Sequence, residues 1–314
     1  MKIRLAVRDW DFITPLLLGD VRAEGIDLIL ERVENLPDDF TKDTRYDAAE
    51  TSMSRYCLAR ARGDESVVGI PHFIMRAFRH RCIVTSKASG ITRIADLTGR
   101  RIGLAGWQDS GNTWTRAILR RDGIGVEDAR WCISRLLPGH PIIDRLAGFG
   151  RPGLVEAVAG DTPLLPMLER DEIDAVFMPF MPAGFFEPAS PFRQLLPEFR
   201  QAEVAYCKAV GYVPGIHLIG LRPEIAKANP AAAHAISAAL DKSNAVWMEK
   251  RLRYADTRPW LLDEMRQVAQ DLPDGWLRNG LSANQHMIAD FCTELTAQGL
   301  TKVSMTPAQL FPHS

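Results

Sequence analysis

The sequence predicts an α/β protein of two lobes, each built on a mixed, mainly parallel sheet. The chain has 314 residues, which is more than a single hydrophobic core usually organises. Strand-like and helix-like segments alternate through two successive blocks, and a mainly helical segment follows them. The second block begins near ADLTGRRIGLAG, where a short turn containing Gly99 leads into a new strand.

The first block holds strand-like runs that combine apolar and β-branched residues between turn signals. They cover residues 3–7, 26–33, 47–52, 66–70 and 81–86. A helix over 53–63 should follow the third run, because Gly63 suits the position just beyond a helix end.

The second block opens with a strand at 101–105 and a helix that begins at Asp109 or Ser110, either of which can cap it. Thr162 and Pro163 predict a cap and a first-turn proline for a helix through Arg170. A strand at 173–178 follows, and residues 138–160 are rich in Gly and Pro and should form a long connection. The remaining predicted helices cover 230–250, 258–270 and 282–298.

Composition excludes several function classes. The formal net charge is −1 and no basic tail or basic helix is present, which argues against nucleic-acid or anionic-membrane partners. The first residues read as a strand rather than a secretory signal, and no segment is long enough to predict a membrane span. We expect a cytoplasmic protein, or a periplasmic one if a signal peptide has been removed. The five cysteines stand singly and should be buried thiols.

Four clusters can carry chemistry, and each also has an ordinary structural interpretation. Ser52 and Ser54 follow a strand and open a helix, which suits an anion site or simple capping. In MRAFRHRC, strand alternation places Arg79 and Arg81 on one face and His80 on the other. These arginines suit a carboxylate ligand, or surface pairing with Asp or Glu.

The third cluster is GWQDSGNTWTR, a loop-to-helix junction that resembles a cradle for a carboxylate or phosphate. It supplies three polar groups, an aromatic face and a cation, namely Gln108, Ser110, Asn112, Trp114 and Arg116. The fourth cluster is His217 in an apolar strand, either a core residue or a functional one. Neither a nucleotide-binding motif nor metal-ligand spacing is present, and we predict no cofactor and no metal.

In this order, the clusters resemble the 4,5-dihydroxyphthalate decarboxylase family, whose fold is like that of the type 2 periplasmic solute-binding proteins. The resemblance covers nearly the whole chain, and its more specific pieces are ETSMSRY and RAFRH. The matching positions include Asp47, Glu50, Ser52, Ser54, Tyr56, Arg76, Phe78, Arg79, His80, Gln108, Trp114, Arg116, Pro182, Phe185 and His217.

The resemblance implies two α/β lobes with the ligand in the cleft between them. Lobe 1 would comprise 1–96 and 207–314, and lobe 2 would comprise 97–206. The chain departs from the family pattern at Phe180, where an arginine is expected, and at His140, which follows Pro138–Gly139. Since Phe180 makes the site less cationic, a mono-carboxylated or differently substituted aromatic acid is as well suited as 4,5-dihydroxyphthalate.

The implied activity is a carboxy-lyase reaction, without a cofactor, in the degradation of aromatic compounds such as phthalates. His80 or His217 would be the acid, Arg79 and Arg116 would orient the carboxylate, and Trp114 would stack on the ring. Hydroxyls would be held by Ser52, Ser54 and Gln108. The alternative is a solute-binding protein that presents an organic acid to an importer, because the fold alone does not separate the two. A homo-oligomer is compatible with either function.

Overall fold

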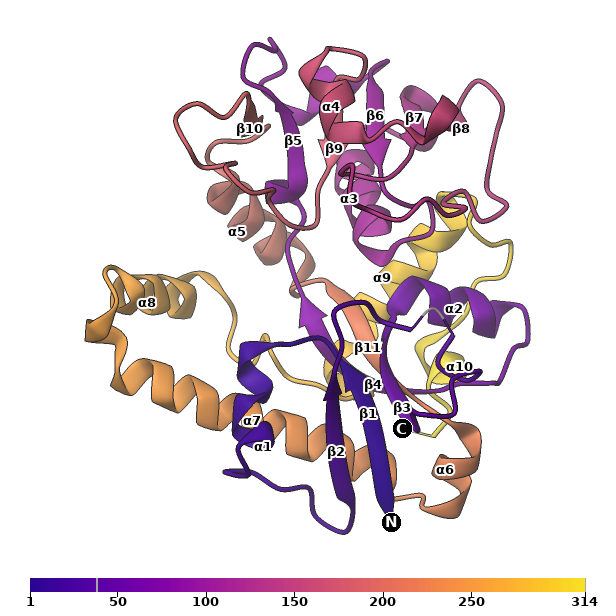
Figure 1. The fold of residues 1–314 in the computed structure, drawn as a ribbon, viewed down its shortest axis with the longest axis vertical. Coiled ribbons are helices and arrows are strands. Elements are labelled where there is room, and N and C mark those ends of the chain that lie inside the picture. Colours follow the sequence, from indigo (N-terminus) through magenta and orange to yellow (C-terminus); the bar gives the residue numbers. More distant parts are fainter. Residues whose placement is uncertain (38, 314) are drawn as a thin grey trace. The chain divides into compact units, whose positions relative to one another are not determined.

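The computed structural model describes residues 1–37 and 39–313 and divides the chain into two compact units (Figure 1). Unit 1 comprises Met1–Arg76, Val210–Ala289 and Met305–Ser314. Unit 2 comprises Ala77–Ala209 and Asp290–Ser304. The sequence placed residues 77–96, 207–209 and 290–304 with the first lobe, so the two divisions differ there.

Unit 1 contains a sheet in the order β2-β1-β3-β11-β4. Its strands are β1 (Lys2–Val7), β2 (Asp27–Arg32), β3 (Ala48–Ser52), β4 (Val68–Arg76) and β11 (Gly215–Leu221). The first three run parallel to one another, whereas β11 pairs antiparallel with both β3 and β4. The predicted α/β class with mixed sheets is therefore confirmed.

The helices in the described part of unit 1 are α1 (Thr14–Leu17), α2 (Met53–Ala61), α6 (Pro223–Ala228), α7 (Ala232–Arg253), α8 (Leu261–Asp271) and α10 (Pro307–Leu310). The longest of them, α7, packs on the sheet and buries its apolar side chains. Ile3 and Leu5 of β1 belong to one core cluster with Ile236 and Leu240 of α7. Burial of each such side chain contributes about 1.5–3 kcal/mol, which ties α7 to the sheet.

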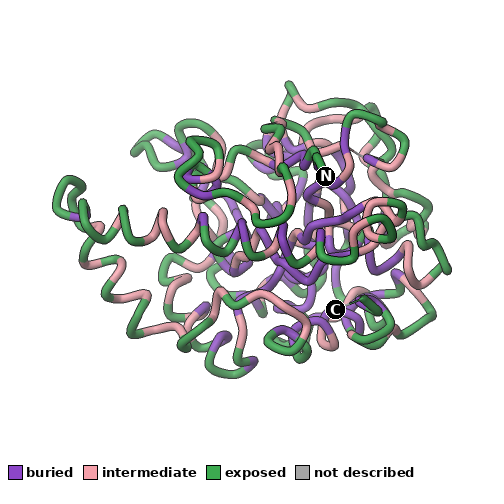
Figure 2. Tube along the Cα trace, turned by 90° about the horizontal axis from the view of Figure 1, so that it is seen from below, coloured by how far each residue is buried: buried purple, intermediate pink, exposed green. Residues whose placement is uncertain are grey.

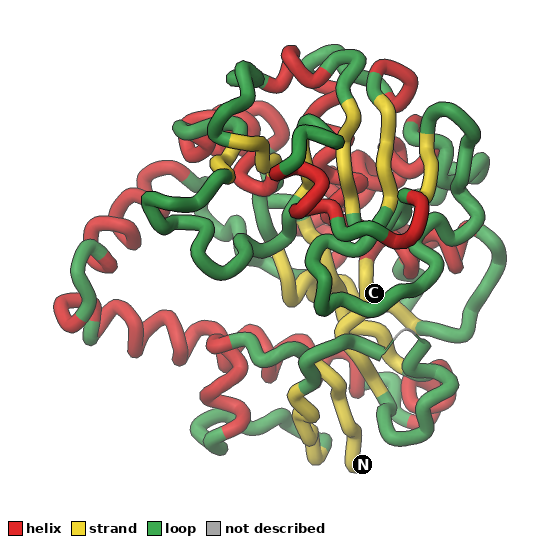
Figure 3. Tube along the Cα trace, turned by 45° about the horizontal axis from the view of Figure 1, so that its top comes forward, coloured by secondary structure: helices red, strands yellow, loops and turns green. Residues whose placement is uncertain are grey.

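Unit 2 contains a second sheet in the order β10-β5-β9-β6-β7-β8, whose strands lie beside red helices in Figure 3. The strands are β5 (Ile83–Ser86), β6 (Arg101–Leu104), β7 (Arg130–Ile133), β8 (Val155–Ala157), β9 (Ala175–Phe177) and β10 (Phe192–Gln194). Helices α3 (Ser110–Arg121), α4 (Leu164–Glu169) and α5 (Phe199–Val210) accompany it, and α9 (Leu281–Ala297) begins in unit 1 and ends in unit 2.

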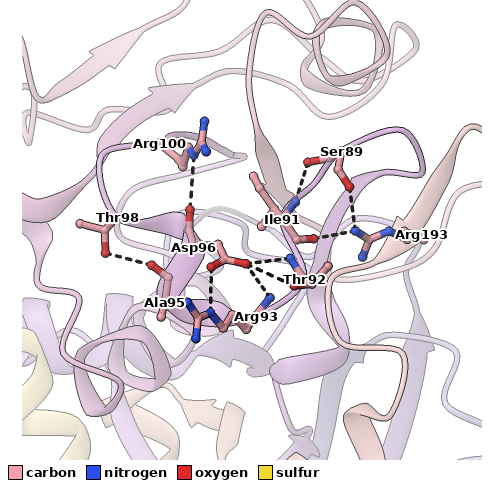
Figure 4. A network of polar contacts seen from close by, with 9 residues as sticks. All are labelled: Ser89, Ile91, Thr92, Arg93, Ala95, Asp96, Thr98, Arg100 and Arg193. Atoms are coloured by element: carbon pink, nitrogen blue, oxygen red, sulfur yellow. Dashed lines mark hydrogen bonds and ion pairs between the residues drawn. The ribbon is translucent and has the colours of Figure 1, made fainter.

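A polar network fixes the connection between β5 and β6 (Figure 4). Asp96 accepts hydrogen bonds from the backbone amides of Thr92 and Arg93, at 3.0 and 3.2 Å. Arg193 donates to the carbonyl oxygens of Ser89 and Ile91. These hydrogen bonds give backbone groups of the loop the partners that they would otherwise lack, and they fix the position from which the chain enters β6.

Three local predictions are wrong. Residues 138–160 are not connection throughout, because they contain strand β8 at Val155–Ala157. The alternation expected over Phe78–Arg81 fails because the strand ends at Arg76 and His80–Cys82 is a 3₁₀-helix. Thr162 is not the cap of α4, since Pro163 occupies that position. The N-cap position of α3 is Asp109, one of the two predicted residues, and Gly63 follows α2 with φ of 79° as expected. All five cysteines are free thiols; Cys132 is partly exposed and the others are buried.

Candidate functional site

In unit 1 the predicted site residues gather where β3 ends and α2 begins. β11 runs antiparallel beside β3, with His217 directly opposite Ser52. Residues opposite each other on neighbouring strands point to the same face, and so do residues two apart on one strand. Glu50, Ser52 and His217 therefore share one face of the sheet.

Glu50 and His217 form a buried carboxylate–imidazole pair. His217 Nδ1 lies 2.6 Å from Glu50 Oε1, and the other carboxylate oxygen accepts from the Trp10 indole at 2.8 Å and the Arg8 amide at 3.0 Å. Burial alone would raise the pKa of Glu50, but the hydrogen bond and charge of His217, with the other two donors, lower it below its ordinary value. Glu50 is consequently ionised at neutral pH.

The ionised carboxylate of Glu50 determines which ring nitrogen of His217 can interact with a ligand. A carboxylate only accepts hydrogen bonds, so His217 Nδ1 holds a proton and Nε2 is the nitrogen available to a ligand. The same pairing orients the imidazole and stabilises its positive charge in acid–base enzymes. The pairing of β11 with β4 is irregular on both sides of His217, and such bulges re-aim side chains at functional sites.

The two serines begin α2. The Ser52 side chain accepts from the Arg55 amide, so Ser52 is the helix cap, as the simpler interpretation predicted. Ser54 is fully buried in the first turn. Their predicted role in holding substrate hydroxyls remains a prediction.

Arg76, at the end of β4, connects separate segments of unit 1. Its terminal nitrogens donate to the Val213 carbonyl at 3.3 Å, the Arg278 carbonyl at 2.9 Å and Asn284 Oδ1 at 2.7 Å. Burial lowers the pKa of Arg76 to about 10, so it stays cationic at neutral pH. These bonds give Arg76 a structural role whether or not it also contacts a ligand.

Arg79 is a buried cation of unit 2 and is 2% exposed. Its guanidinium lies against the first turn of α3, so close that a Cβ on Gly111 would lie 2.9 Å from Nη2. Nε donates to Thr115 Oγ1 at 3.4 Å, and none of the described carboxylates forms an ion pair with it. A buried, uncompensated charge is costly. An anion at the start of α3 would relieve that cost.

His80 and His217 differ in their surroundings. The His80 ring packs edge-on against Tyr206, with centroids 5.4 Å apart. Its Nδ1 is buried and has no hydrogen-bond partner in the described part of the chain. Burial, followed by the charge of Arg81, lowers the pKa of His80 to about 4, so the ring is neutral at neutral pH. A neutral imidazole is a weak proton donor, which favours His217 of the two predicted acids.

The remaining predicted residues of α3 are largely buried within unit 2. Trp114 is 1% exposed and packs against Phe291, with centroids 5.0 Å apart. Arg116 lies 4.0 Å from the centre of the Trp107 ring and donates to Gln298 Oε1 at 2.7 Å. Burial lowers the pKa of Arg116 to about 9. Gln108 is partly exposed in the turn before α3, and Ser110 is the buried first residue of that helix.

Arg81 and Phe180 lie nearer the solvent. Arg81 forms an ion pair with Glu203, with Nε 3.0 Å from Oε1, so it pairs with a carboxylate as the sequence offered as an alternative, although Glu203 itself is buried. Phe180 is 54% exposed and follows β9. The sequence missed Trp10 and Arg8, although a tryptophan just beyond the first strand was the available signal. Within the described ranges, His, Cys, Asp and Glu form no group of three that could hold a metal ion.

Comparison with known proteins defines the class first. Residues 22–133 match the family described as NMT1/THI5 like. The alkanesulfonate-binding protein SsuA from Xanthomonas axonopodis pv. citri has the same fold, with a TM-score of 0.56 and 11% identity over 99% of this chain and 97% of that one. The chain therefore has the type 2 periplasmic-binding-protein fold.

The sequence relatives are more specific. The chain is 27% identical to 4,5-dihydroxyphthalate decarboxylase of Comamonas testosteroni over 99% of its own length and 96% of the relative. It is 29% identical to the enzyme of that name from Pseudomonas putida over 68% of this chain and 83% of the relative. The predicted resemblance is confirmed: the chain is a full-length, distant relative of the 4,5-dihydroxyphthalate decarboxylases. No helix in the described residues is long and apolar enough to cross a membrane.

Proposed function

We propose that this protein is a decarboxylase that removes carbon dioxide from a hydroxylated aromatic carboxylic acid without a cofactor. The observation that carries the proposal is the buried Glu50–His217 pair, which presents an oriented imidazole nitrogen for proton transfer. The relatives named 4,5-dihydroxyphthalate decarboxylase support the reaction class.

The reaction needs one proton and returns one carbon dioxide. His217 Nε2 donates a proton to the ring carbon that bears the carboxylate, and the hydroxyl group para to that carbon supplies electron density as the C–H bond forms. The bond to the carboxylate then breaks, its electron pair restores the aromatic ring, and carbon dioxide leaves. His217 regains its proton from solvent, so the protein ends as it began.

Arg79 supplies the second requirement, a position for the carboxylate. Its buried guanidinium lacks an ion-pair partner among the described residues, and charge-assisted bonds to a carboxylate contribute about 1.5–3 kcal/mol each. With Phe180 in place of an arginine, we propose that the substrate carries a single carboxylate on a ring with an apolar edge. If the substrate instead has two carboxylates, His140 is the first candidate for the second.

The alternative function is that of a solute-binding protein for an organic acid. It rests on the fold shared with the alkanesulfonate-binding protein, and binding requires no proton transfer. A proton donor held by a buried carboxylate gives a binder no benefit, which is why we favour the enzyme.

Isotope incorporation separates the two functions. The protein is incubated in deuterium oxide with 4-hydroxybenzoate, 3,4-dihydroxybenzoate and 4,5-dihydroxyphthalate, and products are followed by nuclear magnetic resonance. We expect at least one acid to yield a phenol with a single deuteron at the vacated carbon. Recovery of every acid unchanged, although one of them raises the melting temperature, would favour the solute-binding protein.

A further inference from the structure

The outer part of the α7–α8 hairpin in unit 1 carries side chains that the described chain leaves uncovered. Buried residues of α7 end at Ser243, ten residues before the helix does, and α8 contains none in its eleven residues. In Figure 2 this hairpin, at the left, is drawn almost entirely in green and pink. The outer part of α7 and all of α8 therefore leave their apolar side chains at least partly accessible to solvent.

The tip of the hairpin is the most exposed apolar region of unit 1. It carries Leu252 (57% exposed), Tyr254 (58%), Trp260 (84%) and Leu262 (51%). Trp260 also has φ of 67°, a conformation that costs a bulky residue energy unless its surroundings compensate. Among the described residues, nothing covers Trp260 to provide that compensation.

A groove continues from this tip. A hollow of about 840 Å³ lies along the hairpin, and Leu252 and Leu262 line it. Its lining includes aromatic and flexible apolar side chains, namely Phe12, Phe73, Trp247, Met248, Met265 and Trp276. Charged side chains such as Arg76, Asp241 and Arg251 also line it, so apolar and charged groups share the groove. Leu262 also lines a smaller depression with Trp260 at the tip, so tip and groove form one surface.

We propose that this surface, from the groove to Trp260, binds the same surface of a second copy of the chain. Trp260, Tyr254, Leu252 and Leu262 together expose on the order of 500 Å², toward the upper end of the roughly 300–600 Å² of the largest apolar patch on a typical monomer, which is often a functional surface. With the groove lining, this approaches the roughly 800 Å² per partner of a stable interface.

The charges of the hairpin suit pairing with itself. The last turn of α7 is basic and the first turn of α8 is acidic. Lys250, Arg253 and Asp263 pair within the chain, with Asp20, Glu249 and Arg266, whereas Arg251 and Glu264 form no ion pair among the described residues. A two-fold axis places the same patch on both partners, so each basic turn can meet the acidic turn of the other copy. A small molecule in the groove would leave Tyr254 and Trp260 in water, which favours the second copy as occupant.

Sedimentation velocity on the full-length protein tests this proposal from low to high micromolar concentration. We expect the wild type to sediment as a dimer or a multiple of it, and Trp260→Ser/Leu262→Ser to sediment at half that mass with an unchanged circular dichroism spectrum. Phe186→Ser is the control, because Phe186 is 80% exposed in unit 2 and should not alter the mass.

Three outcomes overturn the proposal. They are a wild type that stays monomeric at the highest concentration, a double variant that keeps the wild-type mass, and a control variant that dissociates equally. A monomeric wild type whose groove binds a hydrophobic dye would show that the occupant is a small ligand. If the double variant unfolds, Trp260→Ser alone replaces it, since so exposed a side chain contributes little to the fold of the monomer.

Discussion

Glu50 is the residue on which the proposed chemistry depends. Its carboxylate accepts from three donors and is buried, so it holds His217 in one tautomer and one orientation. The charge, rather than the shape, of this side chain matters, because an amide in its place can also donate a hydrogen bond and so favour the opposite tautomer.

We therefore expect Glu50→Gln to lower kcat by about 10²–10⁴-fold while changing KM only a few-fold. Steady-state kinetics on the acid identified above measures both constants. Glu203→Gln is the matched control, since Glu203 is a buried carboxylate that pairs with Arg81 in unit 2. Equal losses in both variants would mean that Glu50 acts only through stability.

The buried histidines predict how stability depends on pH. Burial, with the charge of Arg76, lowers the pKa of His72 to about 3, and burial with the charge of Arg81 lowers that of His80 to about 4, against an ordinary value of 6.5. Below pH 6.5 these two imidazoles bind protons in the unfolded chain but stay neutral in the folded protein until the pH approaches their lowered pKa values. Acid therefore favours unfolding, by up to about 1.4 kcal/mol per pH unit for each histidine.

We expect the melting temperature to fall as the pH is lowered from about 6.5 to about 5, a window in which ordinary carboxylates remain mostly ionised. His72→Asn should reduce the slope, because asparagine can replace the bond between His72 Nδ1 and Ser237 without titrating. Differential scanning fluorimetry across this range provides the measurement. An unchanged slope in the variant would show that His72 can be protonated in the folded protein.

At the scale of elements, the first turn of α3 is shaped around Arg79. Gly111 is needed there because a methyl group would lie 2.9 Å from the guanidinium, closer than such contacts allow. Gly111→Ala should displace Arg79 and weaken binding of an aromatic carboxylate by at least about tenfold, or about 1.4 kcal/mol. The helix itself would gain about 0.5–1 kcal/mol from alanine, so stability should not fall by a comparable amount.

Isothermal titration with 4-hydroxybenzoate and 4,5-dihydroxyphthalate measures this effect. Gly90→Ala is the control, because no atom lies within 4 Å of a Cβ at that position. If Gly111→Ala binds as tightly as the control, the carboxylate does not contact Arg79.

Elements could be predicted where local pattern and burial agree. The runs that became β1, β3 and α2 carry clear apolar patterns and turn residues, and each was predicted within a few residues. Helix α5 was missed because Glu203 occupies one of its buried positions, beside Tyr206, Cys207 and Val210, and so masks the apolar stripe. Glu203 is buried there because it pairs with Arg81, a contact between distant positions.

The sequence could predict which residues belong to the candidate site, but it could not predict which of them contact one another. Glu50, Arg79 and His217 stand out as polar interruptions in apolar segments. The pairing of Glu50 with His217 depends on the register of β3 against β11, strands separated by more than 160 residues, and no local pattern encodes it. The neutrality of His80 likewise follows from burial against Tyr206, which only the folded chain provides.

For the whole molecule, the fold is compatible with either a decarboxylase or a binding protein, and the proton donor separates them. In the proposed mechanism, His217 is needed only when the ring carbon is protonated, whereas Arg79 is needed as soon as the acid is bound. Loss of His217 should therefore affect turnover and binding differently.

Carbon dioxide release by the wild type and His217→Gln, measured beside ligand-induced thermal shifts on a panel of hydroxylated benzoates and phthalates, tests the central claim most directly. We predict that the wild type releases carbon dioxide from at least one acid, preferentially one with a single carboxylate. His217→Gln should release none above background and still show a thermal shift with that acid. Thermal shifts without carbon dioxide from any acid in the wild type, or undiminished release by His217→Gln, would contradict the account.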